Sequence, residues 1–213
     1  MSAGTLNGAA LAVFKPGQEK EYVEFSMNLW KSIKASDIFK YWTGGIATGI
    51  IGLAPSLLNN DPLRQLITKV LDGKTIQRKF SVGTCDANTA EYVVYDYEPS
   101  ETKHADLIET LIASAAIDGV FPPVLRDGRT LVDGGSIWNT NIPSAVQNCR
   151  ELGYDDKDII IDYILCGGKE IAERETEDFH AFKHLLNAWE IRSFYGAMGD
   201  VERTKPFYPE VNF

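Results

Sequence analysis

The sequence is poor in basic residues, with 21 lysines and arginines against 30 aspartates and glutamates, so its formal net charge is −9. A nucleic-acid-binding protein concentrates positive charge against phosphates, and this balance therefore argues against nucleic acid as a partner. Cysteine is scarce too: Cys85, Cys149 and Cys166 are odd in number, widely spaced and without a C-x-x-C pair. We expect neither a disulfide framework nor a cysteine zinc site.

Long apolar runs and glycosylation sequons are also missing. No uninterrupted apolar stretch reaches the roughly 18 to 20 residues that a membrane-spanning helix needs, and no N-x-[ST] triplet occurs. Together with the unpaired cysteines, these absences indicate a protein that is cytoplasmic or peripheral to an intracellular membrane. With 213 residues, of which 44% are hydrophobic and 24% charged, the composition is typical of one globular domain over residues 1–213.

The spacing of apolar residues predicts alternating helices and strands. Small-apolar or amphipathic patterns predict helices over 4–14, 18–33, 61–71, 103–117, 143–152 and 176–198. Other patterns predict a hairpin of strands over 75–85 and 90–97, a proline-interrupted loop over 120–130, a strand end at Leu131-Val132 and a β-branched strand over 158–166. Because this last run is apolar on both faces, it suits a parallel sheet between helix layers. The predicted fold class is α/β, an α/β/α sandwich with a mainly parallel central sheet.

The segment over 43–60 contains no charged residue, and glycines and Pro55 interrupt its apolar residues. Such a composition predicts a loop or lid rather than a regular helix. Tyr41 and Trp42 precede it. Two interpretations stay open: a lid that contacts membrane or acyl chains once it opens, and a loop packed over the core.

Ser2 is followed directly by a small-residue apolar stretch that starts with Ala3 and Gly4. The pattern is typical of the second half of G-x-S-x-G, the strained turn that exposes a nucleophilic serine before a helix. The first glycine of that motif would lie at position zero. We therefore expect the delivering strand and an oxyanion segment to lie upstream, and interpret the domain as incomplete at its N-terminus and also at its C-terminus. Taken alone, Ser2 also fits an ordinary residue of a disordered terminus.

A serine hydroxyl becomes a good nucleophile only beside a base that takes its proton. Asp133 is the best candidate, because it ends a predicted strand and is followed by Gly134 and Gly135, which let the backbone turn without crowding a substrate. Burial in such a site would raise the pKa of the carboxyl group and make it a better base.

The three histidines provide rival explanations. His104 or His184 would complete a Ser-His-Asp triad, although neither lies in a motif that recommends it, and this alternative stays open. His180 and His184 have the spacing of two metal ligands, but the glutamate of H-E-x-x-H is missing, so we predict no metal site.

Three segments together resemble the patatin-like phospholipase domain family, over nearly the whole chain. They are Ser2-Ala3-Gly4, the run A-S-A-A-I-D-G-V-F-P-P over 113–123, and Val132-Asp133-Gly134-Gly135. The resemblance implies an α/β/α sandwich in which a serine and an aspartate, here Ser2 and Asp133, form a catalytic dyad without histidine. Asp118 departs from the family, which usually has proline there, and the N-I-P over 141–143 lies farther from the glycines than usual.

The leading hypothesis is a lipid acyl hydrolase of the phospholipase A or lysophospholipase type, which needs no metal or organic cofactor. Its partners would be a phospholipid or another acyl lipid, with peripheral membrane contact. The backbone N–H of Ala3 would donate a hydrogen bond to the oxyanion. The alternative is a catalytically impaired lipid-binding or regulatory fragment of the same fold, because the upstream oxyanion donors are expected outside this sequence.

Overall fold

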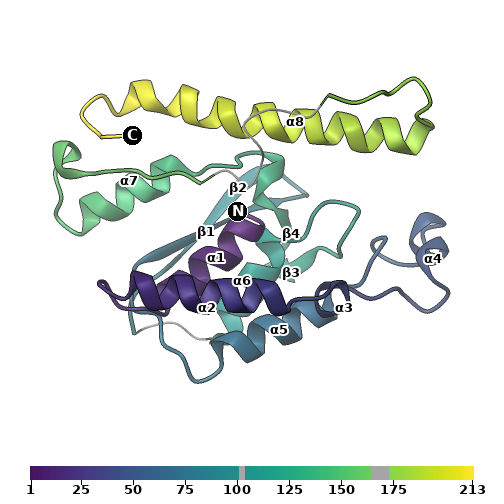
Figure 1. The fold of residues 1–213 in the computed structure, drawn as a ribbon, viewed down its shortest axis with the longest axis horizontal. Coiled ribbons are helices and arrows are strands. Elements are labelled where there is room, and N and C mark those ends of the chain that lie inside the picture. Colours follow the sequence, from purple (N-terminus) through teal and green to yellow (C-terminus); the bar gives the residue numbers. More distant parts are fainter. Residues whose placement is uncertain (101–103, 165–172) are drawn as a thin grey trace. The chain divides into compact units, whose positions relative to one another are not determined.

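The computed structural model in Figure 1 describes residues 1–100, 104–164 and 173–213. The contacts between these residues group into two units, Met1–Ile137 and Trp138–Phe213. Each unit is considered by itself. The single domain predicted over 1–213 stays a prediction, because a grouping of contacts does not test it.

The first unit contains a four-stranded sheet with the spatial order β2-β1-β4-β3. Its strands are β1 (Phe80–Asp86), β2 (Glu91–Tyr97), β3 (Val124–Arg126) and β4 (Arg129–Asp133). All three strand pairings are antiparallel. The predicted hairpin is therefore confirmed as β1 and β2, whereas the mainly parallel arrangement is not found among the described strands.

Short connections explain two of the three antiparallel pairings, β1 with β2 and β3 with β4. A two-residue or four-residue turn can join only antiparallel neighbours, since a parallel pair needs a long crossover. The β3–β4 hairpin turns at Asp127 and Gly128, which have φ values of 50° and 74°, as a two-residue hairpin requires. This turn places a strand inside 120–130, where a loop was predicted. The strand predicted over 158–166 is also corrected: its described part, 158–164, forms a single bridge at Ile160, and 165–166 lie outside the described residues.

The helices predicted for this part of the chain are confirmed, with ends that differ by a few residues. They are α1 (Ala3–Ala12), α2 (Glu19–Ser32), α5 (Asp61–Leu71) and α6 (His104–Ser114), and the short helices α3 (Ala35–Ile38) and α4 (Ile46–Ile50) lie between α2 and α5. The spacing of four residues between Leu63, Ile67 and Leu71 puts all three on one face of α5, and all three are buried.

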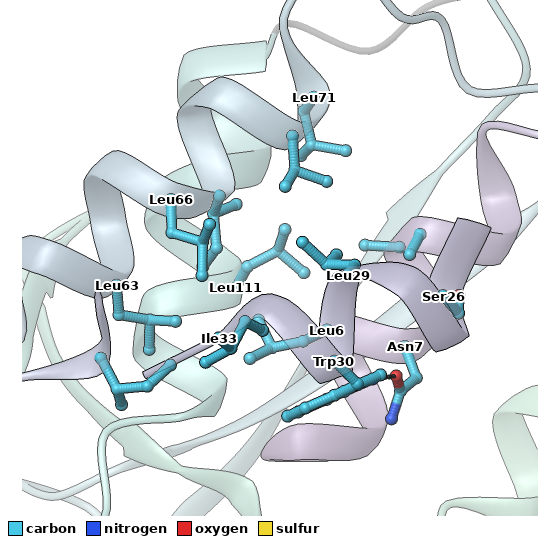
Figure 2. Close-up of a pocket in the computed structure, with 15 residues that line it drawn as sticks. Leu6, Asn7, Ser26, Leu29, Trp30, Ile33, Leu63, Leu66, Leu71 and Leu111 are labelled. Carbon is cyan, nitrogen blue, oxygen red and sulfur yellow. Dashed lines mark hydrogen bonds between the residues drawn. The ribbon is translucent and has the colours of Figure 1, made fainter. Parts of the chain in front are cut away.

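An apolar cavity lies among α1, α2, α5 and α6 (Figure 2). Leucine side chains from these helices line it, and Leu6 of α1 faces it one turn after Ser2. Beside it the Trp30 indole donates a hydrogen bond of 2.8 Å to Asn7 Oδ1, which ties α2 to α1.

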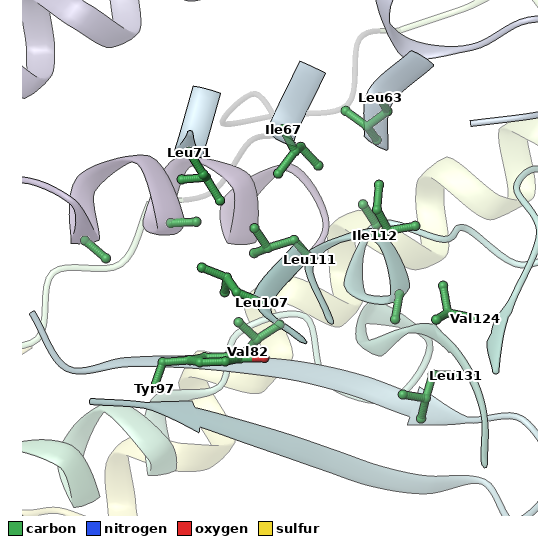
Figure 3. Packing of buried hydrophobic residues seen from close by; sticks show 14 of the residues in the cluster. Leu63, Ile67, Leu71, Val82, Tyr97, Leu107, Leu111, Ile112, Val124 and Leu131 are labelled. Carbon is green, nitrogen blue, oxygen red and sulfur yellow. The ribbon is translucent and has the colours of Figure 1, made fainter. Parts of the chain in front are cut away.

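The main core lies between the sheet and the helices α1, α5 and α6 (Figure 3). Leu107 and Leu111 of α6 meet Val82 of β1 there, and none of the three is more than 1% exposed. Burial of such side chains contributes roughly 1.5–3 kcal/mol each, so this layer fixes α6 against the sheet. The carboxyl ends of α6 and β4 and the start of α1 are thereby held by one packed core.

The second unit contains α7 (Ile142–Glu151) and α8 (Ala181–Thr204). A separate cluster of buried side chains holds it together: Ile142, Val146, Ile159, Ile161, Val201 and Val211. The predicted helices over 143–152 and 176–198 are confirmed in this unit, the second with its start moved to Ala181. In the part of the chain that the structure covers, no helix combines the length and hydropathy needed to cross a membrane.

Candidate active site

Ser2 lies directly before α1 with φ 50° and ψ −130°, a backbone conformation that side-chain-bearing residues rarely adopt. Such a conformation costs on the order of 1–3 kcal/mol and persists only when neighbours enforce it. The Ser2 N–H donates to the Ser114 carbonyl oxygen over 3.0 Å, and the Thr5 N–H donates to the Ser2 carbonyl oxygen over 3.0 Å. A strained serine held at the start of a helix is the geometry of a nucleophile turn.

Ser114 connects this turn to the sheet from the end of α6. Its fully buried hydroxyl donates to the Gly83 carbonyl oxygen over 2.8 Å and lies 2.9 Å from Thr5 Oγ1. Because the Ser114 proton is used on Gly83, the Thr5 hydroxyl is the donor of the second bond. One side chain therefore joins α6, β1 and the first turn of α1.

From the sequence alone, Ser114 had no predicted role beyond its place in the run over 113–123. The sequence does place this serine among small apolar residues at the end of a predicted helix. A hydroxyl group buried there needs hydrogen-bond partners, which was the one local indication of its role. Its partners are 109 and 31 residues away along the chain, which no local pattern reveals.

Asp133 ends β4 opposite Thr84 of the central strand β1. Its N–H donates to the Ala116 carbonyl oxygen over 2.9 Å, and its carboxylate accepts a hydrogen bond of 2.8 Å from the Gly135 N–H. The side chain is buried, with 7% of its surface exposed. The carboxylate is thus fixed in place by the strand before it and the turn after it.

Burial raises the pKa of Asp133 above the ordinary aspartate value, because the charged form loses its hydration. The Gly135 N–H, the Ser2 side chain and the positive charge of the N-terminus partly offset this effect, since all three stabilise the carboxylate, while the smaller effect of the negative charge of Asp118 raises the pKa. The structure therefore places the side chain of Ser2 close enough to the Asp133 carboxylate to affect its pKa.

The backbone approaches closely at Gly83 and Gly134. A Cβ atom at Gly134 would lie 2.7 Å from the Gly83 carbonyl oxygen and 2.9 Å from Met1 Sδ. A Cβ atom at Gly83 would clash with the hydroxyl group of Tyr92, which donates a hydrogen bond to Met1 Sδ over 3.3 Å. The backbone of Gly83 leaves no room for a side chain at Gly134, whereas a side chain at Gly83 would have to displace the side chains of Tyr92 and Met1. Gly135 is exposed and contributes its N–H.

Asp118, which stands where the resembled family has proline, borders this region. It is exposed, and its carboxylate accepts a hydrogen bond of 2.5 Å from the Ser136 hydroxyl. This bond links the loop after α6 to the turn after Asp133. A second carboxylate is therefore present near the buried one.

The first turn of α1 presents backbone N–H groups beside Ser2. The N–H groups of Ala3 and Gly4 have no intrahelical acceptor, because the first turn of any helix lacks one. They also carry the positive end of the helix dipole. Ala3 is half-buried and Gly4 is exposed, so a negative charge that develops beside Ser2 meets hydrogen-bond donors.

The histidines are placed as follows. His104 begins α6, and its side chain lies outside the described residues. His180 and His184 are exposed at the start of α8, where the ring of Phe179 packs 5.6 Å from that of His184. A triad with histidine stays a prediction. Within the described ranges, no cluster of three or more histidine, cysteine or acidic side chains has a metal-binding arrangement.

Residues 1–146 match the family described as patatin-like phospholipase. The matched range covers more than half of the 213 residues and includes both Ser2 and Asp133.

Proposed function

The chain belongs to the patatin-like phospholipase family, and we propose that it is a phospholipase A or lysophospholipase that cleaves carboxylic esters through a dyad of Ser2 and Asp133. Membership in the family supports lipid acyl hydrolysis as the general activity. The contact between Ser2, in its strained turn, and the buried carboxylate of Asp133 is the observation that carries the dyad.

In the first half of the reaction, Ser2 Oγ attacks the ester carbonyl carbon while the Asp133 carboxylate accepts its proton. The carbonyl oxygen becomes an oxyanion, and the N–H of Ala3 at the start of α1 donates a hydrogen bond to it. Collapse of this intermediate expels the alcohol of the lipid, which takes the proton from Asp133. The acyl group then remains on Ser2.

In the second half, water attacks the acyl-enzyme and Asp133 accepts a proton from it. Burial favours this role, because a carboxylate with a raised pKa binds a proton more strongly than an exposed one. Release of the fatty acid returns the proton to Ser2. The cycle uses the side chains of Ser2 and Asp133 and the backbone beside them.

Labelling with a fluorophosphonate tests this proposal. The Ser2 hydroxyl is expected to displace fluoride from phosphorus, so that the mass increase maps to the N-terminal peptide and disappears in Ser2→Ala. Ser32→Ala, a change at an exposed serine, provides the matched control and should label normally. Intact mass must verify that Met1 is present, because its side chain packs against Gly83 and Gly134.

Two results of this labelling would contradict the dyad. Unchanged labelling of Ser2→Ala would assign the nucleophile elsewhere. A folded parent chain that takes up no label would favour the catalytically impaired lipid-binding protein instead.

A second expectation concerns pH. The value of kcat/KM for a soluble short-chain ester should fall in acid with an apparent pKa above the ordinary aspartate value of about 3.9, because Asp133 must be ionised to accept the proton and burial raises its pKa. Asp118→Asn should move this acid limb to lower pH, since the charge of Asp118 raises the pKa of Asp133. Chromatographic detection of the product makes the readout independent of pH. An acid limb at the ordinary aspartate value, unmoved by Asp118→Asn, would contradict the expectation.

A further inference from the structure

Between α3 and α5, residues 41–58 form an excursion that extends away from the rest of the first unit and returns to it. Lys40 and Asn59 close its base through two backbone hydrogen bonds of 2.9 Å, and α4 lies within it. In Figure 1 this 41–58 excursion extends beyond α3, away from the strands.

Hydrogen bonds and close backbone packing give the excursion a defined fold. The Trp42 indole donates to the Ser56 carbonyl oxygen over 3.0 Å, and the Thr48 hydroxyl donates to the Thr43 carbonyl oxygen over 2.8 Å. A Cβ atom at Gly49 would lie 2.5 Å from that same Ser56 oxygen. The excursion is therefore a folded element and not an open loop.

This folded element exposes large apolar side chains. Ile50, Ile51 and Leu53 are 68%, 67% and 76% exposed, and Tyr41 and Ile46 are exposed beside them. We call these five side chains the apolar tip. Water-exposed apolar groups of this size gain free energy on transfer to a hydrocarbon-like phase, at about 25 cal/mol for each Å² that is covered.

Charge on and around the tip indicates which surface it fits. Residues 43–60 contain no charged side chain. Lys40, at the base, forms an ion pair of 2.9 Å with Asp61, and the chain as a whole has a net charge of −9. Anionic lipid headgroups attract basic segments of a protein. Because the excursion has no such segment, electrostatic attraction does not favour its binding to anionic lipid over neutral lipid. An apolar tip without charge suits a surface without net charge.

The base of the excursion is tied to the candidate active site. The N–H groups of Leu57 and Leu58 donate to the carbonyl oxygens of Gly119 and Val120, each over 2.9 Å. These residues directly follow Asp118, which accepts the hydrogen bond from Ser136 in the turn after Asp133. The excursion and the site thus share one loop.

We propose that the apolar tip inserts into the surface of a zwitterionic phospholipid layer and holds the active site against it. The inference rests on the proposed function, because a lipid hydrolase takes its substrate from such a surface. Insertion covers Ile50, Ile51 and Leu53, while the closed base keeps the excursion attached to the Gly119–Val120 loop.

Flotation with phosphatidylcholine vesicles tests the contact without turnover when Ser2→Ala is the parent. The parent should float with the vesicles, and the added double substitution Ile50→Glu and Leu53→Glu should weaken its partition by at least about tenfold, since two charged groups replace inserted apolar ones. Leu125→Glu is the matched control, because Leu125 is 80% exposed on β3, and it should bind like the parent. Adding phosphatidylserine should not strengthen binding.

Several outcomes would overturn the inference: a double variant that floats like its parent, equal loss of binding in Leu125→Glu, or binding that requires phosphatidylserine. A tip buried between two copies of the chain would appear as a dimer that the double variant dissociates, with vesicle binding unchanged, and would overturn it too. With Ser2 intact, the double variant should hydrolyse a soluble ester at the parent rate. If the chain hydrolyses no ester while the double variant alone loses vesicle binding, the proposed function fails and the lipid contact stands.

Discussion

Asp133→Asn is expected to lower kcat for a soluble ester by about 10³- to 10⁴-fold, because asparagine cannot take the proton of Ser2 at neutral pH. The amide oxygen of asparagine still accepts the hydrogen bond from the Gly135 N–H, so the turn after β4 should keep its shape. Steady-state hydrolysis by the purified variant measures the effect. A loss of less than about tenfold would remove Asp133 from the role of general base.

Asp127→Asn is the matched control in the same sheet. Asp127 is exposed at the β3–β4 turn, where its φ is 50°, and Asn-Gly suits this two-residue turn as well as Asp-Gly does. Its kcat should equal that of the parent. The same loss in both variants would show that the assay reports a general effect of changed charge.

The stability of Asp133→Asn distinguishes a functional carboxylate from a structural one. The folded-state pKa of Asp133 is raised, so the folded chain binds this proton more tightly than the unfolded chain. The resulting stabilisation is complete below the ordinary aspartate pKa and is lost as pH rises through the raised one, whereas neutral asparagine keeps it. Urea unfolding should therefore find the variant more stable than the parent at neutral pH, with the difference shrinking in acid. A variant that is less stable at both pH values would make Asp133 a structural residue.

Elements that depend on local patterns were predictable from the sequence. The apolar spacing of α5, from Leu63 to Leu71, determines its buried face, and the alternation around a four-residue turn determines the β1–β2 hairpin. The β3–β4 hairpin had an equally local signal in Asp127-Gly128. The prolines before it directed the prediction to a loop, although they lie outside the paired residues.

The direction of the sheet was not predictable in the same way. A run of consecutive apolar residues indicates burial but does not distinguish a parallel strand from another buried segment. Ile159 and Ile161 are indeed buried, yet they pack in the second unit, and the described part of this run, 158–164, adds no strand to the sheet. The pairing of β1 with β4 joins residues about fifty apart, which depends on tertiary packing rather than on local pattern.

The candidate site shows the same division. Ser2 and Asp133 could be named because their neighbours form recognisable turns, and the structure places them in contact. Ser114 and Gly83 could not be named, because their importance comes from hydrogen bonds and close approach between segments distant in sequence. The residues proposed to carry the chemistry could thus be named from the sequence, while the residues that hold them in position could not.

Gly134→Ala is expected to lower the free energy of unfolding by about 1–3 kcal/mol and kcat by about 100-fold. The added methyl group would lie 2.7 Å and 2.9 Å from the carbonyl oxygen and carbon of Gly83. These are backbone atoms of β1, which cannot yield without disturbing the neighbouring pair of Thr84 and Asp133. A displacement of the Asp133 carboxylate relative to Ser2 therefore accompanies the loss of stability. Urea unfolding and ester hydrolysis measure the two effects.

Gly196→Ala provides the comparison for this substitution. Gly196 lies inside α8 with no heavy atom within 4 Å of an added Cβ atom, so the same change should leave kcat unaltered and raise stability by about 0.5–1 kcal/mol, the helix preference of alanine over glycine. Gly134→Ala could instead unfold at the same urea concentration as the parent and have the parent's kcat. In that case, β1 and the turn after β4 can move apart with little loss of folding free energy. The position of Asp133 would then depend on its own hydrogen bonds with Gly135 and Ala116 rather than on the close approach of the two backbones.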